Sequence, residues 1–275
     1  MISEKKLTNS QNDQPNDRQT STEDRSGENS SSLTALAGLY SQGKRFQEII
    51  SIALCTFLIL INSFFLSYHF ELRKWISILI AAVSGIFTAD FLCGLVHWSA
   101  DTWGSTELPI LGPTIIRSFR EHHLDSSKIL RHDFVETNGD NFMSTIPAHL
   151  YLVACFTLGA KSYISQNYSW FCYIFLLAIF IALTNQIHKW SHTYFGLPEA
   201  VLLLQQIHLI LPRNTHRYHH IQPHNTHYCI TTGWLNYPLD KIRFWYLLEK
   251  GITHLTGIKP RKDDFEWIKG QKILH

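Results

Sequence analysis

The sequence lacks the marks of several common classes of protein. Its five cysteines include no CxxC pair, which gives no disulfide framework and fits a site that faces a reducing compartment. The formal net charge of +2 is too small for a general nucleic-acid-binding protein. The chain also has no glycine-rich dinucleotide fingerprint and no recognisable haem module. Any redox chemistry that it performs therefore needs a separate protein as its source of electrons.

Large apolar side chains are almost absent from residues 1–32, which predicts a disordered segment. This segment has no apolar core for a signal peptide and too many acidic residues for a transit peptide. Residues 33–48 indicate a short amphipathic helix that approaches the membrane. We therefore divide the chain into a tail at 1–45 and a membrane-embedded domain at 46–275.

Apolar residues gather instead in four long runs. Ile49–Tyr68 carries no charge, and Trp75–Trp98 carries one, Asp90. Ile146–Ala160 is marginal in length and is either a span or a re-entrant segment, whereas Trp170–Thr184 is strongly apolar. Because about 20 apolar residues cross a bilayer as a helix, the sequence predicts an all-α membrane bundle of about four transmembrane helices.

The polar segments between these runs predict the topology. Residues 99–145 are hydrophilic and include a turn-like stretch at 137–141. Residues 199–211 are too short to span and predict an interfacial or buried helix that Pro212 ends. Lysine and arginine are more numerous on the side of the N-terminus, which places every clustered histidine on the cytosolic face and His69 on the other.

Eight of the sixteen histidines fall between His188 and His227. His188 and His192 are four residues apart, and His216 precedes His219 and His220 by three and four. Residues at these spacings share one helical face, so each cluster can direct two imidazoles toward one point. Histidine is the commonest metal ligand, and the pattern therefore indicates a metal site rather than scattered polar surface residues.

The second apolar run ends in a polar stripe. Asp90, Gly94, His97 and Asp101 follow helical spacing, so a histidine and two carboxylates face the same way. A carboxylate inside a membrane usually faces the bundle interior with a partner, and Asp90 is either part of the site or satisfied by a nearby hydroxyl. Further along, adjacent histidines at 122 and 123 project about 100° apart, so each could serve a different metal of a pair.

Eight or more neutral imidazoles exceed what one four-coordinate zinc ion requires. They suit two iron ions with coordination positions open to dioxygen, beside membrane spans that give a lipid lateral access. This combination predicts an oxygen-dependent attack on an unactivated C–H bond of a lipid. The alternatives are a zinc-dependent membrane hydrolase, a bis-histidine haem carrier, which would need histidines in both halves of the bilayer, and a non-enzymatic scaffold.

Long stretches of the chain match a known family. They are GLVHWSADTWGS (94–105), FREHHLDSSKILRHDFVETNGDN (119–141), NQIHKWSHTYFGLP (185–198) and LPRNTHRYHHIQPHNTHYCITTGWLNYPLDKI (211–242). From about Ala82 onward the sequence resembles the Kua/CarF-type lipid desaturases, in particular their animal branch.

The resemblance implies removal of two hydrogens beside the ether oxygen of an alkyl-acyl glycerophosphoethanolamine, which gives the vinyl ether of a plasmalogen. It also implies an endoplasmic reticulum location, with electrons from cytochrome b5 and its NADH-dependent reductase. A plastid relative desaturates an acyl chain, so an acyl-chain desaturase or hydroxylase of a phospholipid is the alternative within this chemistry.

The same resemblance implies the site residues. The expected metal ligands are His97, His122, His123, His188, His192, His216, His219 and His220. Asp101 is the acidic residue that accompanies them. Residues that could hold and orient these ligands are Asp90, His132, His208 and His224. His227 departs from the expected animal pattern and is not assigned.

Overall fold

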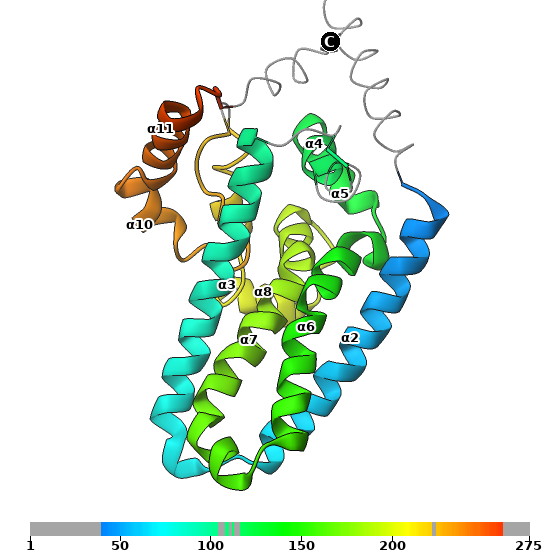
Figure 1. Cartoon of the computed structure of the whole chain (residues 1–275). Helices are drawn as coiled ribbons and strands as arrows, with labels where there is room; N and C mark the ends of the chain where they lie inside the picture. The colour runs from blue at the N-terminus through cyan, green and yellow to red at the C-terminus, as the bar shows by residue number, and fades with distance from the viewer. Residues whose placement is uncertain (1–39, 104–107, 110–111, 113–115, 222–223, 261–275) are drawn as a thin grey trace, which may run out of the picture.

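The computed structural model describes residues 40–103, 108–109, 112, 116–221 and 224–260. All regular elements within these ranges are helices, as predicted (Figure 1). Residues 1–39 of the expected tail lie outside the described ranges. The first described helix begins at Gln42, so residues 42–48 of the expected approach helix and the first span are one continuous element, whereas residues 33–39 lie outside the described ranges.

Four long helices form the body of the molecule: α2 (Gln42–Tyr68), α3 (Trp75–Trp103), α6 (Phe134–Leu158) and α7 (Lys161–His192). A single turn of 3-10 helix, η1 (Leu72–Lys74), precedes α3. Among the described residues these four helices are long and apolar enough to cross a membrane, and they make the chain a multi-pass membrane protein. The third run is thus a full-length helix rather than a marginal one.

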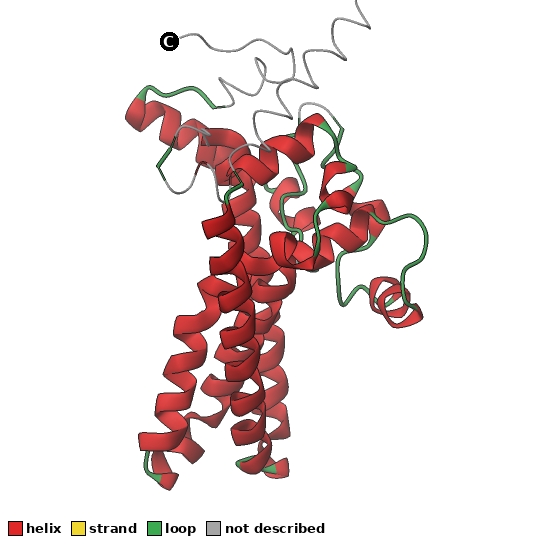
Figure 2. Ribbon diagram, turned by 90° about the vertical axis from the view of Figure 1, so that its right-hand side faces the viewer, coloured by secondary structure: helices red, strands yellow, loops and turns green. Residues whose placement is uncertain are grey.

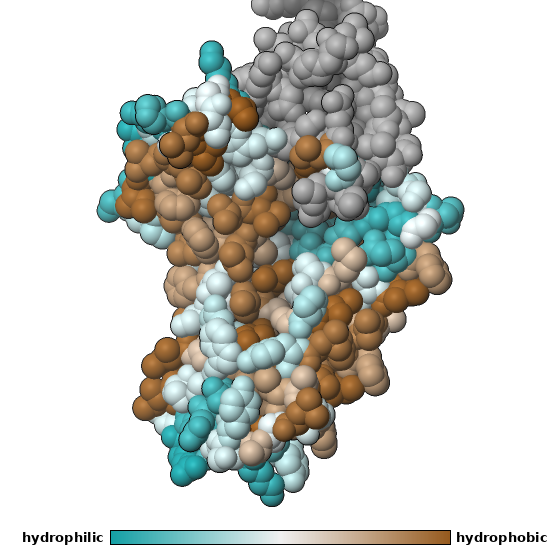
Figure 3. All heavy atoms as spheres, in the orientation of Figure 1, coloured by the Kyte–Doolittle hydropathy of each residue, from teal (hydrophilic) through white to brown (hydrophobic). Residues whose placement is uncertain are grey.

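Large apolar side chains on the outer faces of the bundle are exposed. Phe57, Leu60 and Phe64 on α2 and Leu79 and Ile80 on α3 are each more than half exposed. Figure 3 shows hydrophobic residues along both flanks of the bundle and hydrophilic residues at its lower end. Such a surface is stable only against lipid, because in water it would be a large unpaired apolar patch.

The helices pack in the order α2, α6, α7, α3. The start of α6 is fixed by Asp133, whose side chain accepts hydrogen bonds from the backbone N–H groups of Val135 and Glu136. Residues 137–141 are therefore helical, and the predicted turn there is wrong. Gly139 serves a close contact instead, since a Cβ at this position would lie 2.3 Å from Cγ of Glu48 on α2.

Shorter helices, which together we call the cap, cover one end of the bundle (Figures 1 and 2). They are α4 (Arg117–Leu124), α5 (Lys128–Arg131), α8 (Glu199–Gln206), α9 (Arg213–His216), α10 (Asn236–Lys241) and α11 (Phe244–Thr256). The predicted helix at 199–211 is shorter than expected, because the backbone of His208 turns left-handed at φ 56° and Pro212 caps α9 instead. His69 follows α2 at the opposite end, where its ring stacks on Phe156 at 5.7 Å.

Candidate metal centre

Four elements deliver the clustered histidines to one place. The last turns of α3 and α7, which end at the same side of the bundle, carry His97 and His188. The short helix α4 carries His122, and the segment that starts with α9 carries His216 and His219. The chain thus assembles the site at one end of its spans, as the topology predicts for the clustered histidines.

The first set of side chains, which we call the five-histidine group, brings one ring nitrogen from each member within 4.8 Å of all the others. Its members are His122, His188, His192, His216 and His220. Nε2 of His216 lies 2.8 Å from Nε2 of His188 and 3.0 Å from Nε2 of His220. Nε2 of His220 also lies 3.0 Å from Nε2 of His122.

Hydrogen bonds alone cannot satisfy this arrangement. A ring nitrogen has either one N–H or one lone pair in the ring plane, yet His216 and His220 each face two nitrogens at bonding distance. Nε2 of His192 is buried and has no hydrogen-bond partner among the described residues. Two nitrogens bound side by side at about 2.1 Å from one metal ion are about 3 Å apart, so these spacings fit a shared metal ion.

The second set, which we call the aspartate group, consists of His97, Asp101, His123 and His219. Oδ2 of Asp101 lies 3.2 Å from Nε2 of His97 and 3.5 Å from Nε2 of His219. Oδ1 lies 3.5 Å from Nε2 of His123. One buried carboxylate therefore faces three imidazole nitrogens, a donor set that suits a second metal ion.

Backbone carbonyls fix the tautomers in the aspartate group. Nδ1 of His97 donates to the carbonyl of Tyr228 at 3.0 Å, and Nδ1 of His219 donates to the carbonyl of Thr226 at 2.9 Å. A carbonyl only accepts, so the proton of each neutral ring sits on Nδ1 and the lone pair of Nε2 faces the group. Sequence reasoning missed this support, because main-chain acceptors leave no mark in residue types.

The two groups adjoin. The rings of His219 and His220 are 5.3 Å apart between centroids, and those of His122 and His123 are 6.3 Å apart. Each of these consecutive pairs is divided between the groups. The two neighbouring positions on α4 point to different groups, which lets one short helix contribute to both.

Burial keeps four of the ligand histidines neutral. It lowers the pKa of His122, His216 and His219 well below the usual value, and neighbouring imidazoles lower each pKa further. The same causes lower the pKa of His220 to about 2. Neutral imidazoles present lone pairs without first losing a proton, which is the state that a metal ion requires.

The expected supporting histidines divide into two kinds. His224 adjoins the site, where its ring stacks on His123 at 5.0 Å and its Nδ1 donates to the carbonyl of His219. Nε2 of His132 lies 3.7 Å from a carboxylate oxygen of Glu136, and His132 belongs to neither group. The side chain of His208, by contrast, is exposed and bonds to the nearby carbonyl of Gln206, so it does not reach either group.

Asp90 contacts the main chain of a loop rather than a ligand ring. Its buried carboxylate accepts hydrogen bonds from the backbone N–H groups of Thr231, Thr232, Gly233 and Leu235 at 2.7–3.2 Å. It belongs to neither ligand group. Successive N–H groups turned toward one anion form a concave anion-binding site, so Asp90 anchors the loop that follows the carbonyls behind the aspartate group.

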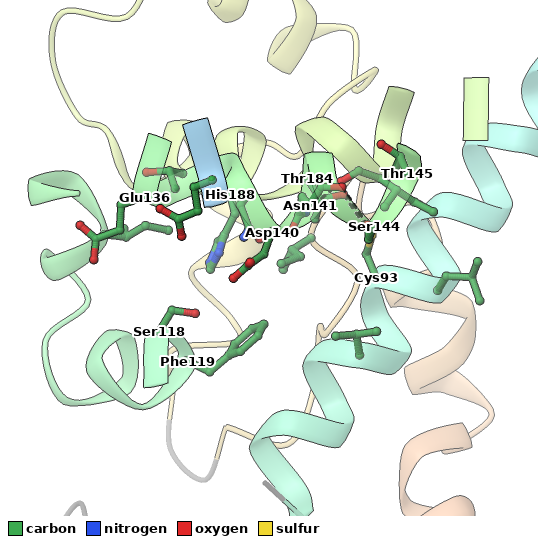
Figure 4. Close-up of a pocket in the computed structure, with 18 of the residues that line it drawn as sticks. Cys93, Ser118, Phe119, Glu136, Asp140, Asn141, Ser144, Thr145, Thr184 and His188 are labelled. Atoms are coloured by element: carbon green, nitrogen blue, oxygen red, sulfur yellow. Dashed lines mark hydrogen bonds between the residues drawn. The ribbon is translucent and has the colours of Figure 1, made fainter. Parts of the chain in front are cut away.

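A cavity of about 500 Å³ opens beside the metal centre, within the range of small-molecule sites. It lies between α3, α6 and α7, with α4 and α5 at one side, and it reaches His122 and His188. Figure 4 shows Glu136 and Asp140 on one side of this cavity and Cys93 on the other. Sequence reasoning did not find the cavity, whose lining residues are scattered along the chain.

Comparisons with known proteins agree with this chemistry. A lipid desaturase domain matches residues 86–263. The chain is 54% identical to plasmanylethanolamine desaturase 1 of Mus musculus over 241 residues, which cover 86% of this chain and 87% of that protein. It is 47% identical to plasmanylethanolamine desaturase of Myxococcus xanthus over 189 residues, which cover 68% and 64% of the two chains. It is 28% identical to the chloroplastic fatty acid desaturase 4 of Arabidopsis thaliana over 198 residues, which cover 70% and 58%. No solved structure matches the chain.

Proposed function

The chain belongs to the lipid desaturase family, and we propose that it introduces the 1Z vinyl-ether double bond into 1-O-alkyl-2-acyl-glycerophosphoethanolamine, the step that makes a plasmalogen. The observation that carries this proposal is the pair of adjoining ligand groups beside a cavity with an apolar wall. The names of the mouse and bacterial relatives support the ether lipid as the substrate.

We assign one iron ion to each ligand group. Iron, when bound, supplies the one-electron chemistry and the activation of dioxygen that removal of hydrogen from an alkyl chain requires. The nine side chains of the two groups hold the ions, and Asp101 adds negative charge to an otherwise neutral ligand set. The apolar cavity wall orients the alkyl chain and excludes water from the reacting carbons.

The electrons come from outside the chain in this proposal, from reduced cytochrome b5 and its NADH-dependent reductase. We place the protein in the endoplasmic reticulum membrane, with the metal centre and both termini on the cytosolic side. Support comes from the basic residues beside the cap, such as Lys128 and Arg131, against few at the far end. The five free cysteines also fit a reducing compartment.

Expression in cells that lack plasmalogens but accumulate the alkyl-ether precursor tests the proposal. We expect vinyl-ether lipids with the wild-type chain and none with His188→Ala at equal abundance in the membrane. Vinyl ethers absent from both, with new double bonds or hydroxyl groups in acyl chains only with the wild type, would move the activity to the acyl-chain alternative.

A further inference from the structure

The cavity beside the metal centre has two chemically different ends. Its apolar wall comes from the three spans α3, α6 and α7 and includes Leu92, Val96, Ala148, Ile174, Leu177 and Ile181. Its polar end comes from α4, α5 and the first turns of α6, and it includes Arg117, Lys128, His132, Glu136 and Asp140. The cavity thus has the polarity of a phospholipid, with a charged end that faces the cap.

If the proposed function holds, the position of the metal centre determines which end of the cavity receives the headgroup of the lipid. The two carbons that become the vinyl ether are the first and second carbons of the alkyl chain, counted from the glycerol ether oxygen, so only a short stretch of glycerol separates them from the phosphate. The headgroup must therefore bind close to the metal ligands, whereas the rest of the alkyl chain extends away. His122, from the five-histidine group, lies on α4 beside the residues of the polar end.

We propose that this polar end selects the headgroup: Lys128 binds the phosphate, and the carboxylates of Glu136 and Asp140 bind the primary ammonium of ethanolamine. Lys128 is half-buried in the cavity wall and forms no ion pair with any side chain that the structure describes. The buried Arg117, 4% exposed, already pairs with Glu136 at 3.1 Å. Lys128 is accordingly the cation that remains available for an anion.

Glu136 and Asp140 are four residues apart on α6, so both carboxylates face the cavity from the same side of the helix (Figure 4). Glu136 is bound by Arg117, and Asp140 is bound by Lys44. An ionised carboxylate has about four acceptor positions, so each retains capacity for an ammonium N–H. Asn141 and Ser144 on the same helix add neutral acceptors to this wall.

This chemistry discriminates between headgroups. A primary ammonium donates hydrogen bonds to carboxylates, whereas the quaternary ammonium of choline has no N–H and is usually held by a cage of aromatic rings. Phe119 is the one Phe, Tyr or Trp among the described residues that line the cavity. The polar end is therefore suited to ethanolamine and poorly suited to choline.

The test uses the full-length protein in membranes, supplied with alkyl-acyl lipids that differ only in their headgroup: ethanolamine, dimethylethanolamine and choline. Lys128→Ala is expected to raise the apparent KM about 10-fold for all three lipids, because each carries the phosphate and a charge-assisted hydrogen bond is lost. Arg131→Ala is the matched control, since Arg131 is a mostly exposed cation on the same short helix and does not line the cavity.

Glu136→Gln and Asp140→Asn are expected to lower the ratio of ethanolamine to choline turnover about 10-fold, since a charged acceptor is lost. The ratio is measured within one preparation, so a partly misfolded variant still reports it. An unchanged ratio in both variants, or a KM for Lys128→Ala equal to that of Arg131→Ala, would overturn the headgroup assignment while wild-type turnover upholds the proposed function. If the wild type forms no vinyl-ether product, that result contradicts both the proposed function and the headgroup assignment.

Discussion

The five-histidine group and the aspartate group are built by different means. The aspartate group contains a carboxylate, and backbone carbonyls fix the tautomers of His97 and His219. The five-histidine group has only nitrogen donors, and Nδ1 of His122 and His216 has no hydrogen-bond partner among the described residues. His97 and His219 are therefore oriented by the main chain, and His122 and His216 by packing. We expect the two halves of the centre to differ in charge and in sensitivity to distant changes.

The largest effects are expected from removing one ligand of either group. His216→Ala and His219→Ala should each lower vinyl-ether formation by more than about 100-fold, beyond the usual cost of losing a supporting residue. Each should also lower the metal content per chain, measured on purified protein by elemental analysis. His208→Ala is the matched control, because this exposed histidine belongs to neither group. Full activity in either ligand variant would contradict the grouping.

Asp101→Asn removes the difference in charge between the groups. The amide retains the shape of the side chain but places a donor or a neutral oxygen where the carboxylate faces three Nε2 atoms. We expect activity to fall about 10- to 100-fold at unchanged membrane abundance. Asp125→Asn, at a carboxylate outside the site, controls for the loss of a charge. Equal rates in the two variants would show that Asp101 has no part in the centre.

Asp90→Asn tests whether the main chain orients the aspartate group. The amide leaves part of the loop at 231–235 without acceptors, at a cost of about 2–4 kcal/mol in the free energy of unfolding. The carbonyls of Thr226 and Tyr228 precede this loop, so the aspartate group should lose metal before the five-histidine group does. Metal loss followed against increasing chelator concentration checks the order, and simultaneous loss would argue against separate support.

Gly94→Ala gives the smallest effect. A Cβ at this position would lie 2.6 Å from Sγ of Cys229 and 3.3 Å from its backbone, which separates α3 from the C-terminal segment at a cost of about 1–3 kcal/mol. Cys229→Ala removes the sulfur, so the double variant should regain part of the lost thermal stability. Identical melting of the single and double variants would show that this contact is not the cause.

The spans and the ligand clusters could be predicted from the sequence because both are local patterns. Uncharged runs such as Ile49–Tyr68 indicate a membrane helix by themselves, and the spacing of His188 and His192 needs only the helical repeat. The stretch at 137–141 was mispredicted because its polar residues and glycine are also typical of a turn. Two features favour a helix there: the N-terminal hydrogen bonds that Asp133 accepts, and the close contact between Gly139 and Glu48. Neither can be recognised from the residues 137–141 alone.

The features that the sequence did not predict depend on contacts between residues far apart in the chain. Asp90 was predicted to have a partner, but its four N–H donors come from a loop about 140 residues further along the chain. The left-handed turn at His208 that shortens α8 likewise depends on its surroundings, because Trp234 donates to the carbonyl of this residue. The cavity has no sequence signal at all, since its wall combines residues from several helices.

Metal stoichiometry of the purified full-length protein tests the two-group centre most directly. We predict two iron ions per chain, with one remaining after substitution of His216 and one after substitution of His219. Both substitutions together should leave none. A single metal ion in the wild type would contradict the two-group centre, and zinc in place of iron would contradict the iron assignment.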